Sequence, residues 1–232
     1  MQYFGGKTKV SNQIVKYLES VRKENQIYIE PFVGGGIICS KMSGKRKAYD
    51  FNEYLIEMYK AVQEGYELPN SINEEEYKYI KDHKDEDKAL TGFVGFGCSF
   101  AGKWFGGYAR DKRKKYDFAH TAKFGLLKKM STMKDVDFEW ADYKVLQFEN
   151  CLIYCDPPYC DTTQAYGIGE FNTEEFWDVM RKWSENNDVY ISEYIAPDDF
   201  KYVLEMQTKT DIRNRNNRME KRVERLFRYN GN

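Results

Sequence analysis

Three short apolar segments of the sequence are each followed directly by an acidic residue. They are residues 26–29, 47–49 and 151–155, and the residues that follow are Glu30, Asp50 and Asp156. Segments of this length and composition are typical of buried strands. Between them lie segments with the apolar spacing of helices, at residues 8–23, 53–63 and 173–184. This order predicts an α/β fold in which helical crossovers connect a mostly parallel sheet.

The acids mark one edge of that sheet as the place for a ligand. In open α/β sheets, ligands bind beyond the carboxyl ends of the strands. Three carboxylates there favour a ligand with hydroxyls, amines or a positive charge. We therefore expect a Rossmann-like sheet with helices on both faces and a site at this edge. Further elements are expected at residues 117–130 (helix), 136–140 (strand) and 189–192 (strand).

A glycine-rich turn, Glu-Pro-Phe-Val-Gly-Gly-Gly at residues 30–36, follows the first strand. Glycines let a ligand approach the backbone, and a helix from Gly36 to about Met42 would offer free N–H groups. The turn lacks the G-x-G-x-x-G spacing of dinucleotide sites, and a purely structural turn would explain the glycines equally well. Asp50, at the end of the next strand, stands where an acid accepts hydrogen bonds from ribose hydroxyls.

A second glycine pair precedes Lys7, in the sequence Gly5-Gly6-Lys7-Thr8. It is not a P-loop, because that motif needs a glycine five residues before the Gly-Lys pair and Met1 stands there. Lys7 nevertheless follows a flexible turn and precedes a helix. Its ammonium could reach a ligand carboxylate, although an exposed lysine is the simpler interpretation.

The segment Asp156-Pro157-Pro158-Tyr159 is the most specific signal in the chain. Two prolines fix the backbone and remove N–H donors, so that the Pro157 carbonyl is left facing the crevice. A carboxylate and a carbonyl side by side can accept both hydrogens of an exocyclic amine. Tyr159 then offers a flat face on which the base carrying that amine can stack.

These motifs together resemble the Dam-like class of DNA adenine-N6 methyltransferases. The matching pieces are Tyr3-Phe4-Gly5-Gly6-Lys7, residues 30–36, Tyr49-Asp50 and Asp156-Pro157-Pro158-Tyr159. Two departures are Tyr3 in place of the commoner tryptophan and the third glycine, Gly36. The resemblance implies that S-adenosylmethionine is the cofactor and that the substrate is a flipped adenine in double-stranded DNA. It also implies direct methyl transfer without a metal.

The resemblance places the two kinds of site residue on these motifs. It implies catalytic roles for Asp156, Pro157 and Tyr159. It implies cofactor binding at the positions of Tyr3, Lys7, Asp50 and Asp156. We expect further cofactor contacts from the same motifs, at Gly6, Glu30, Phe32, Gly34, Gly36 and Phe51.

Opposite charges are separated along the chain, although its formal net charge is only −1. Residues 64–87 contain nine acidic and three basic residues, whereas residues 101–134 contain ten basic and two acidic ones. The basic block suits DNA phosphates, although a solvated charged face is the plain alternative. We expect phosphate or base contacts from Lys103, Arg110, Lys112, Arg113, Lys114 and Lys115.

Residues 63–116 break the strand–helix alternation and are interpreted as an inserted DNA target-recognition lobe. The catalytic domain would then be residues 1–62 and 117–232. Six glycines between Gly92 and Gly107 favour irregular backbone there rather than a long helix. Four arginines of the tail are expected either to flank the duplex or to lie on an exposed arginine-rich helix. They are Arg213, Arg215, Arg218 and Arg222.

The remaining features favour a cytoplasmic protein of a bacterium or of a phage-infected bacterial cell. An odd number of cysteines, five, is typical of reduced thiols, and no metal site is expected. No apolar run is long enough to span a bilayer, and the start lacks a signal-peptide core. A restriction endonuclease partner is left open. The competing functions are the same chemistry on RNA, on cytosine N4 or on a protein glutamine, and a catalytically silent nucleic-acid-binding module.

Overall fold

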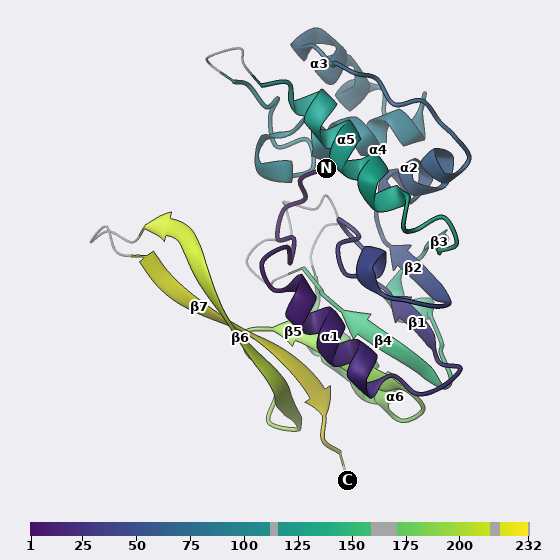
Figure 1. Ribbon diagram of the computed structural model, residues 1–232, viewed down its shortest axis with the longest axis vertical. Helices are drawn as coiled ribbons and strands as arrows, with labels where there is room; N and C mark the ends of the chain where they lie inside the picture. The colour runs from purple at the N-terminus through teal and green to yellow at the C-terminus, as the bar shows by residue number, and fades with distance from the viewer. Residues whose placement is uncertain (112–115, 159–170, 214–218, 232) are drawn as a thin grey trace.

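The computed structural model describes residues 1–111, 116–158, 171–213 and 219–231 (Figure 1). Within them the strands form one sheet in the order β3-β2-β1-β4-β5-β7-β6. The parallel strands are β1 (Ile27–Glu30), β2 (Arg46–Asp50), β3 (Asp137–Trp140), β4 (Cys151–Cys155) and β5 (Asp188–Glu193). The long hairpin of β6 (Phe200–Arg213) and β7 (Met219–Tyr229) adds to β5 in antiparallel orientation.

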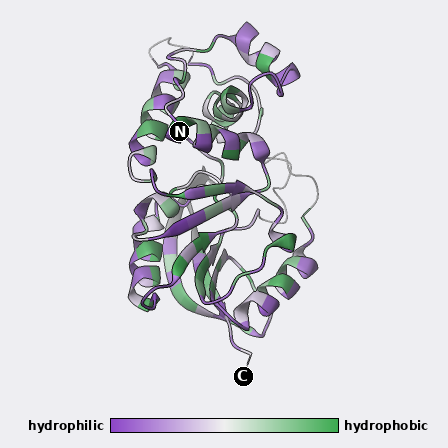
Figure 2. Ribbon diagram, turned by 90° about the vertical axis from the view of Figure 1, so that its right-hand side faces the viewer, coloured by the Kyte–Doolittle hydropathy of each residue, from purple (hydrophilic) through white to green (hydrophobic). Residues whose placement is uncertain are grey.

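Helices cover both faces of the sheet. On one face, α1 (Ser11–Val21) packs Ile14 and Leu18 against the strands, and on the other α6 (Thr173–Ser184) packs Phe176 and Met180. Strand β4 contributes buried side chains to the cores on both faces, because side chains alternate along a strand. In Figure 2, green hydrophobic and purple hydrophilic segments alternate along the helices beside the sheet. The predicted Rossmann-like class, with a mostly parallel sheet and helices on both faces, is confirmed.

A helical lobe lies beyond one end of the sheet (Figure 1). It consists of α2 (Glu53–Gln63), α3 (Glu74–Asp82), α4 (Lys88–Gly97) and α5 (Phe118–Met130). Helix α4 packs against α2, α3 and α5, so the inserted residues share a core with helices that flank them in sequence. The domain boundaries at 62/63 and 116/117 remain a prediction.

The expectation of irregular backbone after Gly92 is wrong for the first part of that segment. Gly92, Gly95 and Gly97 lie in α4, where a Cβ on Gly92 would come 2.0 Å from the Tyr54 carbonyl oxygen. These glycines permit close helix packing rather than a turn. The tight turns come only afterwards, at Gly102 and Gly107, which have positive φ.

Two further expectations are corrected. No long helix follows Gly36, because the chain forms turns and then only a short 3₁₀ helix, Cys39–Lys41. The tail is the β6–β7 hairpin rather than an arginine-rich helix. Arg215 and Arg218 lie outside the described residues. In the part of the chain that the structure describes, no helix is long and apolar enough to cross a membrane.

Candidate active site

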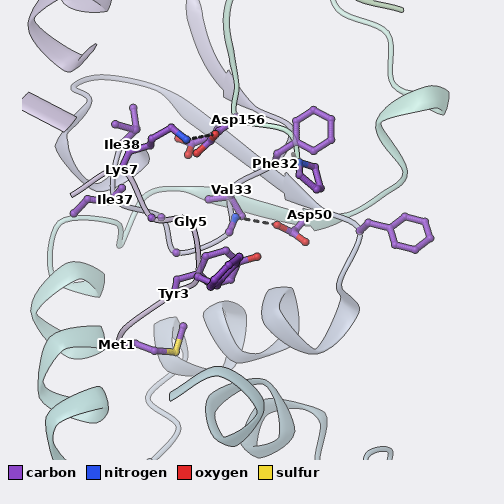
Figure 3. A pocket seen from close by; sticks show the side chains of 18 of the residues that line it. Met1, Tyr3, Gly5, Lys7, Phe32, Val33, Ile37, Ile38, Asp50 and Asp156 are labelled. Atoms are coloured by element: carbon purple, nitrogen blue, oxygen red, sulfur yellow. Dashed lines mark hydrogen bonds and ion pairs between the residues drawn. The ribbon is translucent and has the colours of Figure 1, made fainter. Parts of the chain in front are cut away.

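A cavity of about 600 Å³ lies at the carboxyl ends of the parallel strands (Figure 3). Its walls come from the N-terminal segment, the glycine-rich turn, the ends of β2 and β4, and helix α5. Every residue expected to bind the cofactor lines it: Tyr3, Gly6, Lys7, Glu30, Phe32, Gly34, Gly36, Asp50, Phe51 and Asp156. The motifs meet here because the parallel strands end at the same edge of the sheet.

The glycine-rich turn is held in place from three sides. Gly34 and Gly36 have φ values of +44° and +65°, a backbone conformation that favours glycine. The Gly34 N–H donates to Asp50 Oδ2 at 2.9 Å, and its carbonyl accepts from the Tyr59 hydroxyl at 2.7 Å. A Cβ on Gly34 would lie 2.7 Å from the Tyr3 ring. The absence of side chains therefore lets Tyr3 cover the turn.

Asp50 is buried, and it organises two segments of backbone. Its Oδ1 accepts from the Asn52 N–H at 2.9 Å, while its Oδ2 accepts from Gly34. Burial raises the pKa of Asp50 to about 6, although these backbone N–H groups oppose the rise. Phe51 follows it with half of its surface exposed and lines the same cavity. Asp50 can therefore hold both the turn and a hydroxyl-bearing ligand.

Lys7 lies buried between two carboxylates. Its Nζ is 2.7 Å from Asp156 Oδ1 and 2.9 Å from Glu224 Oε1. Burial alone would lower the pKa of Lys7, but both carboxylates outweigh it and raise that pKa. The pKa of Asp156 is also raised, to about 6, because burial and the Glu224 charge together outweigh the opposing effect of Lys7. The ammonium thus faces the Asp-Pro-Pro-Tyr motif.

Glu30 is a third buried acid of the cavity. Its Oε2 accepts from the Tyr28 hydroxyl at 2.7 Å, and burial raises its pKa to about 8. Lys129, from α5, lines the cavity near it and donates to the Gly35 carbonyl. Burial lowers the pKa of Lys129 to about 8. The cavity can therefore offer both a cation and an acid to a zwitterionic ligand.

The structure brings together only part of the expected catalytic and DNA-binding sets. Pro157 is buried and Pro158 lines the cavity, whereas Tyr159 lies outside the described residues. Lys103 places its ammonium 4.8 Å from the centre of the Phe4 ring. Arg110 is exposed and bonded to Glu74, with Nη2–Oε1 at 2.6 Å. The other expected DNA contacts, Lys112, Arg113, Lys114 and Lys115, are not among the described residues.

Sequence reasoning missed several residues of the site. Glu224, Lys129 and Tyr143 carried no motif, and their positions follow only from tertiary contacts. Asp142, which follows β3, also lines the cavity. Among the described residues no group of three or more histidines, cysteines and acids is arranged to hold a metal ion.

The fold and this site define a Rossmann-like protein with a cavity at the carboxyl ends of its parallel strands, and part of the sequence matches a known family. Residues 3–92 match the family of D12 class N6 adenine-specific DNA methyltransferases. This match confirms the resemblance found in the motifs over the N-terminal part of the chain.

One curated relative is the Type II methyltransferase M.FokI of Planomicrobium okeanokoites. It is 24% identical over 197 residues, which are 73% of this chain and 30% of that protein. This chain thus spans less than a third of its relative's length.

Solved structures with a similar trace include a precorrin 8w decarboxylase from Methanobacterium thermoautotrophicum and TehB from Haemophilus influenzae. Each is 8% identical to this chain, with TM-scores of 0.43 and 0.40 respectively. The first alignment covers 98% of this chain and 92% of the other, and the second covers 95% and 62%. Neither likeness bears on what this chain binds.

Proposed function

We propose that this chain transfers the methyl group of S-adenosylmethionine to the N6 amine of adenine in double-stranded DNA. The observation that carries the proposal is the placement of the Asp156 carboxylate, paired with Lys7, on the same cavity as the glycine-rich turn and Asp50. An amine acceptor and a nucleoside site then share one wall. The family match over residues 3–92 supports the same activity.

The cavity has the chemistry that S-adenosylmethionine requires. Asp50 is placed to accept from the ribose hydroxyls, and the half-exposed Phe51 ring is placed to contact the adenine moiety. Glu30 and Lys129 match the ammonium and carboxylate of the amino-acid end. These residues therefore fit the cofactor, which supplies the activated methyl group when it is bound.

The reaction needs a nitrogen lone pair rather than a covalent enzyme intermediate. The target adenine would leave the duplex and enter the cavity. The Asp156 carboxylate and the Pro157 carbonyl accept from its amine, which localises the lone pair, and Tyr159 stacks on the ring. When bound, S-adenosylmethionine would supply the methyl group: the N–C bond would form as the methyl–sulfur bond breaks, S-adenosylhomocysteine would leave, and the proton lost by the amine would pass to Asp156 or to water. Positioning and fixed charges supply the rate enhancement.

Methyl transfer onto genomic DNA, followed by mapping of the modified adenines, tests the function directly. Titration with S-adenosylmethionine by calorimetry separates an enzyme from a silent DNA-binding module, which would release no heat. Methyl groups on cytosine N4, or only on RNA or protein, would contradict the proposed substrate.

Lys129→Met is expected to weaken S-adenosylmethionine binding at pH 7 by about tenfold or more, the loss of one charge-assisted hydrogen bond. Lys129 donates to a backbone carbonyl in the apoprotein, so its charge is available to the cofactor carboxylate. Calorimetry gives the change in Kd, and Lys128→Met, the exposed neighbour, serves as the control. Equal affinities of the two variants for S-adenosylmethionine would show that Lys129 does not contact the cofactor.

We propose that Lys103 and Arg110 belong to the DNA-binding face of the lobe, together with Lys112, Arg113, Lys114 and Lys115. Arg110→Ala is expected to weaken DNA binding on all sequences and to reduce its salt slope by about one charge. Glu74→Ala should act in the opposite direction, because Glu74 now occupies two N–H groups of Arg110. Fluorescence anisotropy over a salt series measures both. The same sign for both variants would contradict a phosphate contact.

A further inference from the structure

The ion pair between Lys7 and Asp156 has a third member that comes from the far end of the chain. Glu224 lies on β7, and its Oε1 is 2.9 Å from Lys7 Nζ. The side chains of Lys7 and Glu224 are 3% and 8% exposed, whereas that of Asp156 is 21% exposed and lines the cavity. The cluster therefore contains two acids around one buried cation, with Asp156 as the member that a substrate can reach.

The register of the sheet explains why Glu224 arrives there. Strand β7 pairs with β5 through Glu193↔Arg225 and Ile191↔Phe227. Glu224 precedes Arg225 on β7, and it shares a face with the fully buried Leu226 because side chains alternate along a strand. That face packs toward α1, whose N-terminal end follows Lys7. The hairpin thus carries an acid to the carboxyl end of β4.

The position of the ammonium affects how Asp156 is presented to a substrate. Lys7 Nζ is 2.7 Å from Asp156 Oδ1 and 2.9 Å from Glu224 Oε1. Because the three side chains form one cluster, a change at Glu224 alters where the ammonium lies and how strongly it neutralises the Asp156 carboxylate.

We propose that Glu224 is a positioning residue for methyl transfer: it shares the buried Lys7 ammonium with Asp156 and so sets the orientation and charge of the carboxylate that accepts from the adenine amine. This inference rests on the proposed function for its kinetic consequences. Its structural content, the control of Asp156 through Lys7, does not.

The ionisation of Asp156 should report the same arrangement. In the described part of the chain, the charged or titratable groups around Asp156 are Lys7, Glu224, Glu30, Glu193, Tyr154 and Cys155. Glu224 raises the pKa of Asp156. Glu224→Gln removes that charge but keeps an oxygen for Lys7, so the pKa of Asp156 should fall. The transfer rate, which needs ionised Asp156, should then persist to lower pH than in the wild type.

Two variants at position 224 and one matched control test the proposal. Glu224→Leu removes the acceptor for Lys7 and is expected to lower kcat by about tenfold to a hundredfold, with little change in cofactor Kd. Glu224→Gln should restore most of kcat and shift the acid limb of its pH profile downwards. The control is Glu205→Gln, an exposed acid of the same hairpin paired with Arg225, which should change neither.

The outcomes separate the proposal from a structural role and from failure of the proposed function. A wild-type kcat in Glu224→Leu would overturn the proposal. So would a Glu224→Leu protein that loses stability and cofactor affinity together, if the acid limb of the kcat profile of Glu224→Gln does not move. Carboxyl ¹³C NMR of the apoprotein, with Asp156→Asn to assign the signal, reads the Asp156 pKa without catalysis. A lowered pKa in Glu224→Gln supports the contact even in a protein that methylates nothing, and an unchanged pKa overturns it.

Discussion

Asp156→Ala is expected to reduce methyl transfer by about a thousandfold or more at saturating cofactor, the upper range for loss of one preorganised electrostatic group. The carboxylate is the acceptor that we assign to the adenine amine, and the neighbouring carbonyl of Pro157 cannot replace a charge. DNA binding should be largely unchanged, because the expected phosphate contacts lie on the lobe. Incorporation of labelled methyl groups measures the first effect, and fluorescence anisotropy the second.

The fold should tolerate this substitution. Removing Asp156 leaves Lys7 with a carboxylate partner, Glu224 at 2.9 Å, so that no buried charge is left unpaired. Asp137→Ala is a matched control, since its exposed carboxylate pairs only with Lys47 on the surface in the described structure. Methylation by Asp156→Ala at a rate close to that of Asp137→Ala would refute the catalytic role.

The cofactor side of the site could be predicted because it depends on local motifs and one topological rule. Each acid ends a strand, and parallel neighbours end at one edge, so Glu30, Asp50 and Asp156 had to lie near one another. The segment around Lys7 joined them through the resemblance to a known family. The roles of these residues in binding and catalysis remain predictions.

Glu224 could not be predicted, because its place depends on the antiparallel register of β7 on β5. In sequence it is one acid among basic residues, and the same residues were equally compatible with a helix. The prediction of irregular backbone at the glycines of α4 was wrong for a related reason. A local rule assigns them to turns, whereas tertiary contacts require small residues inside the helix. Helix α2 approaches Gly92, the Trp104 ring approaches Gly95, and Ala122 of α5 approaches Gly97.

Gly92→Ala is expected to destabilise the protein, although alanine is the better helix former by about 1 kcal/mol. The new Cβ would lie 2.0 Å from the Tyr54 carbonyl oxygen and 2.9 Å from the Met58 Cβ, both on α2. Backbone atoms cannot move aside as a flexible side chain can, so α4 must shift away from α2. Overpacking of this kind costs about 3 kcal/mol, which leaves a net loss of about 2 kcal/mol in the free energy of unfolding.

Urea unfolding measures this loss, and Lys81→Ala, an exposed position in α3, should change stability by less than about 0.5 kcal/mol. The effect should also reach the cavity. Helix α2 carries Tyr59, whose hydroxyl donates to the Gly34 carbonyl, so a displaced α2 loosens the glycine-rich turn and weakens cofactor binding. A Gly92→Ala protein as stable as the wild type would show that α4 and α2 do not pack at this distance. Small changes in the position of the helical lobe would then not disturb the glycine-rich turn of the proposed cofactor site.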